Sequence, residues 1–109
     1  MQISIVGLGS VGTAAFTVLN EHHSVTGYDI DGRGEWGDVL QSEVAIVCVS
    51  TDGGVDGRLD MGNIHVIAGR LALDGFQGVM LVKSTLQPGT MDQIASDHPH
   101  LKMSYVPEF

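Results

Sequence analysis

Short, β-branched apolar runs alternate along the chain with segments whose apolar residues recur every three or four positions. The first pattern predicts strands and the second predicts helices. The predicted strands are Gln2–Val6, Ser24–Tyr28, Val44–Val49, Val79–Val82 and Leu101–Val106. Because Val44–Val49 is apolar throughout, it fits a strand that is covered on both faces of a parallel sheet.

The predicted helices lie between these strands. They are Ser10–Glu21, a short helical turn over Trp36–Gln41, Met61–Leu73, and a last helix that has Pro88 in its first turn and runs to Ser96. Asp60 has the position of an N-cap for the third helix. The apolar stripes are Val11, Ala14, Ala15, Val18 and Leu19 in the first helix, and Ile64, Ile67, Ala68 and Leu71 in the third.

A glycine motif joins the first strand to the first helix. Gly7-Leu8-Gly9-Ser10-Val11-Gly12 has the spacing G-x-G-x-x-G, directly after a strand and at the start of a helix, as dinucleotide sites require. Gly7 allows a tight turn, Gly9 lets a pyrophosphate approach the backbone, and Gly12 lets the helix pack close to the strand. The motif and the strand–helix alternation together predict a Rossmann-like α/β fold, with a doubly wound, mostly parallel sheet and helices on both faces.

Asp29 directly follows the second predicted strand, 22 residues beyond Gly7, where an acidic side chain hydrogen-bonds the adenosine ribose. A carboxylate there also repels the 2′-phosphate of NADP, so the sequence favours NAD. Arg33 in the following loop is close enough to contact the adenosine end, where a cation would favour NADP. A solvated loop charge is the simpler interpretation of Arg33, and Asp29 has the greater weight because its strand fixes its position.

Composition limits the classes of function. The 109 residues are 43% hydrophobic and 17% charged, as in a globular protein, and they suffice for a single domain over residues 1–109. A net charge of −8 argues against a basic surface for nucleic acid or an anionic membrane. Cys48 is the only cysteine, which fits a reducing compartment. The chain shows neither a cationic leader nor a membrane-length apolar stretch, so we expect a cytoplasmic protein.

Further segments follow the glycine motif in a fixed order: Gly27-Tyr28-Asp29-Ile30-Asp31, Val49-Ser50-Thr51, Asp56-Gly57 with Asp60, KSTLQPGT over residues 83–90, and SYVPEF over residues 104–109. With the motif, they resemble the N-terminal domain of the UDP-glucose/GDP-mannose 6-dehydrogenase family over nearly the whole chain. The most specific segment is KSTLQPGT, which is similar to the family's K-S-T-x-x-P-G-T. The closing PEF is similar to the start of the family's N-P-E-F-L-R-E.

The resemblance implies an enzyme that uses NAD to oxidise the C6 alcohol of a nucleotide sugar to a carboxylate in two hydride transfers. It implies that Gly9, Ser10 and Val11 hold the pyrophosphate and that Asp29 holds the adenosine ribose. Thr51 would lie near the nicotinamide-side ribose, and Ser50 before it is a further candidate for cofactor binding. Thr85 would lie in the same cofactor site and position the water that hydrolyses a thioester intermediate. Either threonine hydroxyl could instead cap a helix or a turn.

The chain also departs from the family. The family's catalytic cysteine, and the lysine and asparagine that assist it, have no counterpart in these 109 residues. Cys48 is no substitute, because inside an apolar strand it fits a small buried hydrophobe. Glu108 matches the first glutamate of its stretch and not the one that activates water. The segment from Asp31 to Val44 is short, which predicts a reduced sheet edge. We therefore expect NAD binding without turnover by this chain alone.

The remaining candidates for chemistry have simpler interpretations. His22-His23 fits a solvated pair that the dipole at the end of the first helix favours. His98-Pro99-His100 fits a turn, and no Cys or carboxylate cluster completes a metal site with it. Asp52, Asp56 and Asp60 lack the spacing of a calcium loop, so we expect no metal. Trp36, the only tryptophan, could pack on adenine or on a neighbouring helix, and we favour the helix.

Other functions stay open beside that of a dehydrogenase portion whose catalytic half lies elsewhere. One is a standalone dinucleotide-binding module that works with a partner subunit or associates with itself. Another is a dehydrogenase of small 3-hydroxy acids, whose sequences share the opening motif. KSTLQPGT and PEF argue against this third function. A remnant that binds nothing is disfavoured because all three motif glycines and Asp29 are present.

Overall fold

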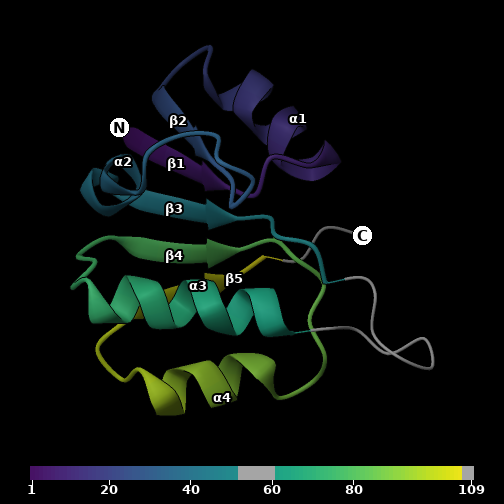
Figure 1. Cartoon of the computed structure of the whole chain (residues 1–109), viewed down its shortest axis with the longest axis vertical. Coiled ribbons are helices and arrows are strands. Elements are labelled where there is room, and N and C mark those ends of the chain that lie inside the picture. Colours follow the sequence, from purple (N-terminus) through teal and green to yellow (C-terminus); the bar gives the residue numbers. More distant parts are fainter. Residues whose placement is uncertain (52–60, 107–109) are drawn as a thin grey trace.

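The computed structural model describes residues 1–51 and 61–106, and in them strands and helices alternate from end to end (Figure 1). The strands are β1 (Gln2–Val6), β2 (Ser24–Tyr28), β3 (Val44–Val47), β4 (Val79–Val82) and β5 (Lys102–Tyr105). The helices are α1 (Ser10–Leu19), α2 (Trp36–Gln41), α3 (Gly62–Leu73) and α4 (Thr90–Asp97). The predicted bounds of β1, β2, β4 and α2 are confirmed residue for residue.

The described strands form one five-stranded, all-parallel sheet in the order β2-β1-β3-β4-β5. Parallel neighbours need a crossover connection, and the helices supply it. Since α1 packs with one side-chain cluster of the sheet and α2, α3 and α4 with the other, both faces carry helices. This confirms the expected Rossmann-like, doubly wound fold.

The connection from β2 to β3 is short, as the sequence predicts. It consists of a loop over residues 29–35 and the six-residue α2, and it contributes no strand to the described sheet. Consequently β2 is an edge strand, and β3 pairs with β1 rather than with β2, so that Ile3 lies opposite Val44.

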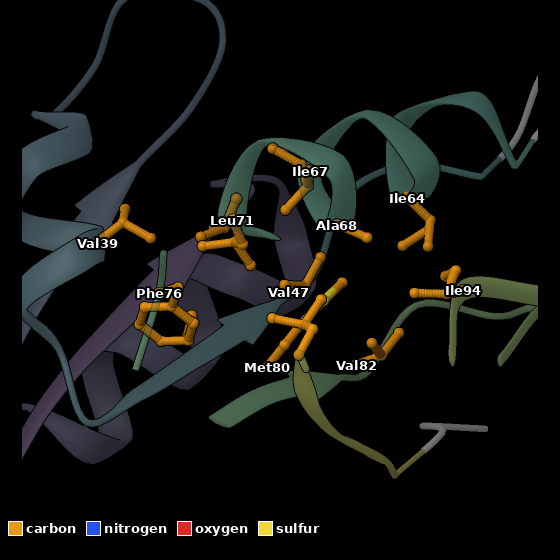
Figure 2. Close-up of a cluster of buried hydrophobic side chains, with 13 residues drawn as sticks. Val39, Val47, Ile64, Ile67, Ala68, Leu71, Phe76, Met80, Val82 and Ile94 are labelled. Carbon is orange, nitrogen blue, oxygen red and sulfur yellow. The ribbon is translucent and has the colours of Figure 1, made fainter. Parts of the chain in front are cut away.

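The larger core cluster lies between the sheet and α3 (Figure 2). Val47 and Met80 reach up from β3 and β4, and both are fully buried. The predicted stripe of α3 faces them, because Ile64, Ile67, Ala68 and Leu71 are the buried residues of that helix. Burying each large aliphatic side chain stabilises the fold by about 1.5–3 kcal/mol, so this contact fixes α3 over the centre of the sheet.

The predicted buried face of α1 is largely wrong. Its half-buried apolar side chains are Ala15, Phe16 and Leu19, which pack on the cluster around Ile3, Ile5 and Ile46. Val11 and Val18 are 42% and 65% exposed, and Ala14 is exposed as well. The physical reason is Gly12, the one fully buried position of α1, which faces the sheet and sets the rotation of the helix.

Other differences concern the ends of elements. α1 ends at Leu19 and β3 at Val47, two residues before each predicted end. α4 begins at Thr90 and does not include Pro88, because Gly89 has a left-handed φ of 87°, which a right-handed helix cannot contain. The N-cap residue of α3 is Met61 and not Asp60. Asp60 itself lies outside the described residues, as do Asp52, Asp56-Gly57 and Pro107-Glu108-Phe109.

None of the helices within residues 1–51 and 61–106 is both long enough and apolar enough to cross a lipid bilayer.

Candidate functional site

A pocket of about 780 Å³ opens where the carboxyl ends of β1, β3 and β4 meet. β1 and β3 are neighbours whose connections leave toward opposite faces of the sheet, so the pocket lies at a topological switch point. Open α/β sheets bind their ligands at such a point. The residues that line it are Val6, Gly7, Gly9, Ser10, Val11, Asp29, Ile30, Cys48, Val49, Ser50, Thr51, Asn63, Val66, Ile67, Lys83, Ser84 and Thr85.

The outer glycines of the motif serve packing. Gly7 has a φ of +99°, and a Cβ on it would lie 2.8 Å from the carbonyl group of Cys48, so only glycine fits this turn beside β3. A Cβ on Gly12 would lie 1.8 Å from the carbonyl oxygen of Gly7. The predicted roles of Gly7 in the turn and Gly12 in helix packing are thereby confirmed. Gly12 does not line the pocket and acts on it only by drawing α1 close.

Gly9 differs, because a Cβ on it would have no protein atom within 4 Å. It is the N-cap residue of α1 and lines the pocket together with Ser10 and Val11. No side chain caps this helix end, and the first intrahelical bond runs from the amide of Thr13 to the carbonyl of Gly9. The amides before Thr13 and the positive end of the helix dipole therefore suit an anion.

Asp29 stands at the end of β2 with its side chain 20% exposed, and it lines the pocket. One carboxylate oxygen accepts a 2.8 Å hydrogen bond from the amide of Leu8, and the other accepts one of 3.2 Å from the amide of Asp31. These bonds hold the carboxylate beside the glycine loop. Each oxygen retains lone pairs for further donors, such as sugar hydroxyls.

Arg33 lies beside Asp29 but is not among the residues that line the pocket. Its guanidinium is 3.6 Å from the Asp29 carboxylate and 2.9 Å from that of Asp31. The hydrogen bond from Arg33 holds the pKa of Asp31 below its ordinary value, and the same bond raises the pKa of Arg33. With two carboxylates around one guanidinium, this corner of the site is negative at neutral pH.

The opposite wall follows β3 and β4. Ser50 and Thr51 come from the end of β3, and Thr51 is buried. The side-chain amide of Asn63 donates to the carbonyl of Ser50 at 3.1 Å, and the hydroxyl of Ser84 donates to the carbonyl of Val49 at 2.7 Å. These bonds fix the loop after β3 to α3 and to the loop after β4. Exposed Thr85 lines the pocket beside Ser84.

The interpretation of Cys48 as a buried strand residue is wrong. β3 ends at Val47, and Cys48 follows it as a half-buried residue that lines the pocket. The apolar run in the sequence continues past the strand because Cys48 and Val49, directly after β3, still pack on the two core clusters.

Several pocket residues were not predicted from the sequence. Asn63, Val66 and Ile67 come from the start of α3, Lys83 from the end of β4, and Ile30 from the loop after β2. Ile30 and Val66 are 71% and 64% exposed, so apolar side chains stand open at the pocket. A parallel sheet gathers its loops at one edge, which could have indicated Lys83 and Ile30. Nothing in the sequence distinguishes Val66 from an ordinary surface residue.

Trp36 lies away from the pocket and packs on α3, the alternative that the sequence favoured. Its ring lies 4.0 Å from the guanidinium carbon of Arg70, and its indole N–H donates to Asp74 at 2.8 Å. Within the described ranges, no three His, Cys, Asp or Glu side chains come together as a metal site.

No protein-family model and no curated protein matches the chain. Solved structures do match it. A GDP-mannose dehydrogenase from Pseudomonas aeruginosa aligns over 100% of this chain and 36% of its own, with a TM-score of 0.83 and 23% identity. A UDP-D-ManNAc dehydrogenase from Pyrococcus horikoshii aligns over 100% and 36%, with a TM-score of 0.82 and 20% identity.

A UDP-glucose dehydrogenase from the hyperthermophilic archaeon Pyrobaculum islandicum aligns over 98% of this chain and 35% of its own, with a TM-score of 0.75 and 22% identity. The chain thus has the fold of one part of these dehydrogenases. It spans 35–36% of the length of the three.

Proposed function

We propose that residues 1–109 are a single NAD-binding domain and the cofactor-binding portion of a nucleotide-sugar 6-dehydrogenase. The observation that carries the proposal is the convergence of Gly9, the uncapped N-terminus of α1 and Asp29 on one pocket at the switch point of the sheet. The fold that the chain shares with three solved nucleotide-sugar dehydrogenases supports the same function.

The residues present fit a dinucleotide. The open space at Gly9 admits a pyrophosphate to the amides of Ser10 and Val11. Asp29 accepts from the adenosine ribose hydroxyls, and Ile30 and Val66 offer exposed aliphatic surface to adenine. The pocket volume of about 780 Å³ lies within the ordinary range for small-molecule sites, about 300–1,000 Å³.

The charge around Asp29 favours NAD over NADP. A 2′-phosphate would meet the carboxylates of Asp29 and Asp31, and the guanidinium of Arg33 is already paired with both. Arg33 therefore neutralises part of the negative charge beside the ribose. Because its guanidinium is already paired, it does not offer a free positive charge to the 2′-phosphate of NADP.

The remaining site residues belong to the nicotinamide half. Bound NAD supplies a hydride acceptor. Ser50 and Thr51 would contact the nicotinamide-side ribose, and the hydroxyl of Thr85, which both donates and accepts, would orient a water molecule. The cysteine, lysine and asparagine that the resemblance requires for turnover are supplied by a catalytic half or a partner subunit. Cys48, the only cysteine of the sequence, fits a reducing, cytoplasmic location.

Calorimetric titration with NAD and with NADP tests the proposal on the native chain and on Asp29→Asn. An asparagine still accepts the 2.8 Å bond from Leu8, so the glycine loop stays in place, but it removes one negative charge. We expect the native chain to bind NAD at least about 10-fold more tightly than NADP, and the Asp29→Asn substitution to reduce this ratio toward unity.

Two results would contradict the proposal. Absence of NAD binding by the native chain at millimolar ligand would remove the cofactor function. Equal binding of NAD and NADP that Asp29→Asn leaves unchanged would show that the ribose does not lie at Asp29.

A further inference from the structure

We infer that Arg70 is a positioning residue for the adenosine end of the site, and that it acts by fastening both ends of the loop that carries Asp29. The inference rests on the proposed NAD function for its ligand, but its structural part stands on contacts outside the pocket. Those contacts link Tyr28, Trp36, Arg70 and Asp74, which we call the α3 clamp.

The clamp joins the two residues that border the loop over residues 29–35. Tyr28 is the last residue of β2 and Trp36 the first of α2. The guanidinium of Arg70 donates a 2.8 Å hydrogen bond to the hydroxyl of Tyr28. The same group lies 4.0 Å from the centre of the Trp36 ring, and the two aromatic rings meet edge to face at 5.2 Å.

Asp74, the C-cap residue of α3, is the fourth residue of the clamp. It accepts a 2.8 Å hydrogen bond from the indole N–H of Trp36, so the indole is held on its face by Arg70 and at its edge by Asp74. α3 itself is fixed by its buried stripe, and its first turns line the pocket through Asn63 and Val66. The clamp thereby ties the loop to a rigid element that also forms a wall of the site.

The loop has bonds of its own, including those of Arg33 with the carboxylates of Asp29 and Asp31, and the clamp adds an attachment of its two ends to α3. The amide of Asp29 donates to the carbonyl of Arg33 at 2.9 Å, and the amide of Gly32 donates to the carbonyl of Asp29 at 3.2 Å. Residues 30–35 are all exposed, and both Gly32 and Gly34 have positive φ. β2, which precedes the loop, is an edge strand of the described sheet, so no further strand lies beside it on that side. The clamp thus stabilises the position of Asp29 beside the glycine motif.

The test compares the native chain with Arg70→Ala, with Tyr28→Phe, which removes only the hydroxyl, and with Leu73→Ala as a control. Leu73 is on the same helix and 86% exposed. Without ligand, we expect the amides of Asp29 and Gly32 in Arg70→Ala to exchange with solvent about 10-fold faster, since the lost stack and hydrogen bond together are worth roughly one decade. The amides of β3 and β4 in the same variant should stay protected. The fluorescence emission of Trp36, the one tryptophan, should shift because the ring loses its contact with Arg70.

With NAD, we expect Arg70→Ala to raise Kd about 10-fold, Tyr28→Phe to raise it less, and Leu73→Ala to leave it unchanged. In an Asp29→Ala background, Arg70→Ala should change Kd by less than about 2-fold, because a residue that acts through Asp29 is not additive with it. An equal loss in both backgrounds would overturn the inference.

Unchanged exchange of Asp29 and Gly32 in Arg70→Ala would also overturn it. The exchange and emission measurements need no ligand, so they test whether Arg70 holds the loop even if the native chain fails to bind NAD. Such a failure would overturn the proposed function, but it would not change the conclusion on the loop.

Discussion

Gly9 and Gly12 both stand in the glycine motif, but different atoms exclude a side chain at the two positions. At Gly12 the obstacle is the carbonyl oxygen of Gly7, which belongs to the protein. At Gly9 the protein offers no obstacle within 4 Å, and only a ligand would occupy the space. The two positions therefore separate folding from binding.

We predict that Gly12→Ala lowers the free energy of unfolding by about 1–3 kcal/mol, as overpacking does. Gly9→Ala should change it by less than about 0.5 kcal/mol and raise the Kd for NAD at least about 10-fold. Urea unfolding and calorimetric titration measure the two quantities. Gly37→Ala is the matched control, since Gly37 is exposed and a Cβ on it also meets no atom within 4 Å.

Native-like NAD affinity in Gly9→Ala, with Gly37→Ala normal, would show that the pyrophosphate does not lie against Gly9.

Single residues of the site were predictable where a motif sets their geometry. The roles of Gly7 and Gly12 follow from the spacing of the glycines and from their place between strand and helix. The bond from the amide of Leu8 to Asp29 was not predictable, because it depends on the pairing of Val6 with Tyr28 in the sheet. Arg70 was missed for the same reason: its partners come from β2 and α2.

At the scale of elements, α1 and α3 differ in how well their buried faces were predicted. The stripe of α3 is correct because polar residues such as Asn63 and Arg70 occupy its other faces. α1 is apolar on most sides, so the spacing of its apolar residues fits more than one rotation. Packing of Gly12 against Gly7 selects the rotation, and periodicity contains no information on that contact.

Charge substitutions test which face of α1 is buried. Val18→Lys should change the free energy of unfolding by less than about 0.5 kcal/mol, because the side chain is 65% exposed. Leu19→Lys should lower it by about 1–3 kcal/mol, because Leu19 packs on the cluster around Ile3 and Ile5. Chemical unfolding of the two variants measures both. A loss for Val18→Lys as large as that for Leu19→Lys would support the face that the sequence predicted, because that face contains both residues.

At the scale of the whole molecule, the site lies on the line where β1 meets β3. Its N-terminal side holds the glycine motif and Asp29, and its C-terminal side holds Thr51, Lys83 and Thr85. Strand alternation and the motif were sufficient to predict this placement, because ligands of such sheets bind at the switch point. The helical wall of the pocket was not predictable, since it depends on how α3 lies across the sheet.

A ligand that contacts both sides of this line should stabilise the whole fold. At 100 times its Kd, NAD adds about 2.7 kcal/mol to the free energy of unfolding. For a domain of this size we expect Tm to rise by about 10 °C, as measured by circular dichroism. NADP at the same concentration, if it binds about 10-fold more weakly, should add about 1.4 kcal/mol and so raise Tm about half as much. An equal rise with both nucleotides would contradict the role of the charges around Asp29.

The strand order also bears on how the chain folds. β1 pairs with β2 within the first 28 residues, and the two strands are connected by α1. β3, β4 and β5 pair in sequence order, and α3 and α4 connect them. The contact between β1 and β3 joins these two halves across the longest stretch of chain, and such distant contacts form slowly. A nucleotide that spans them can bind only after they have joined. It should therefore slow the unfolding rate and leave the folding rate unchanged.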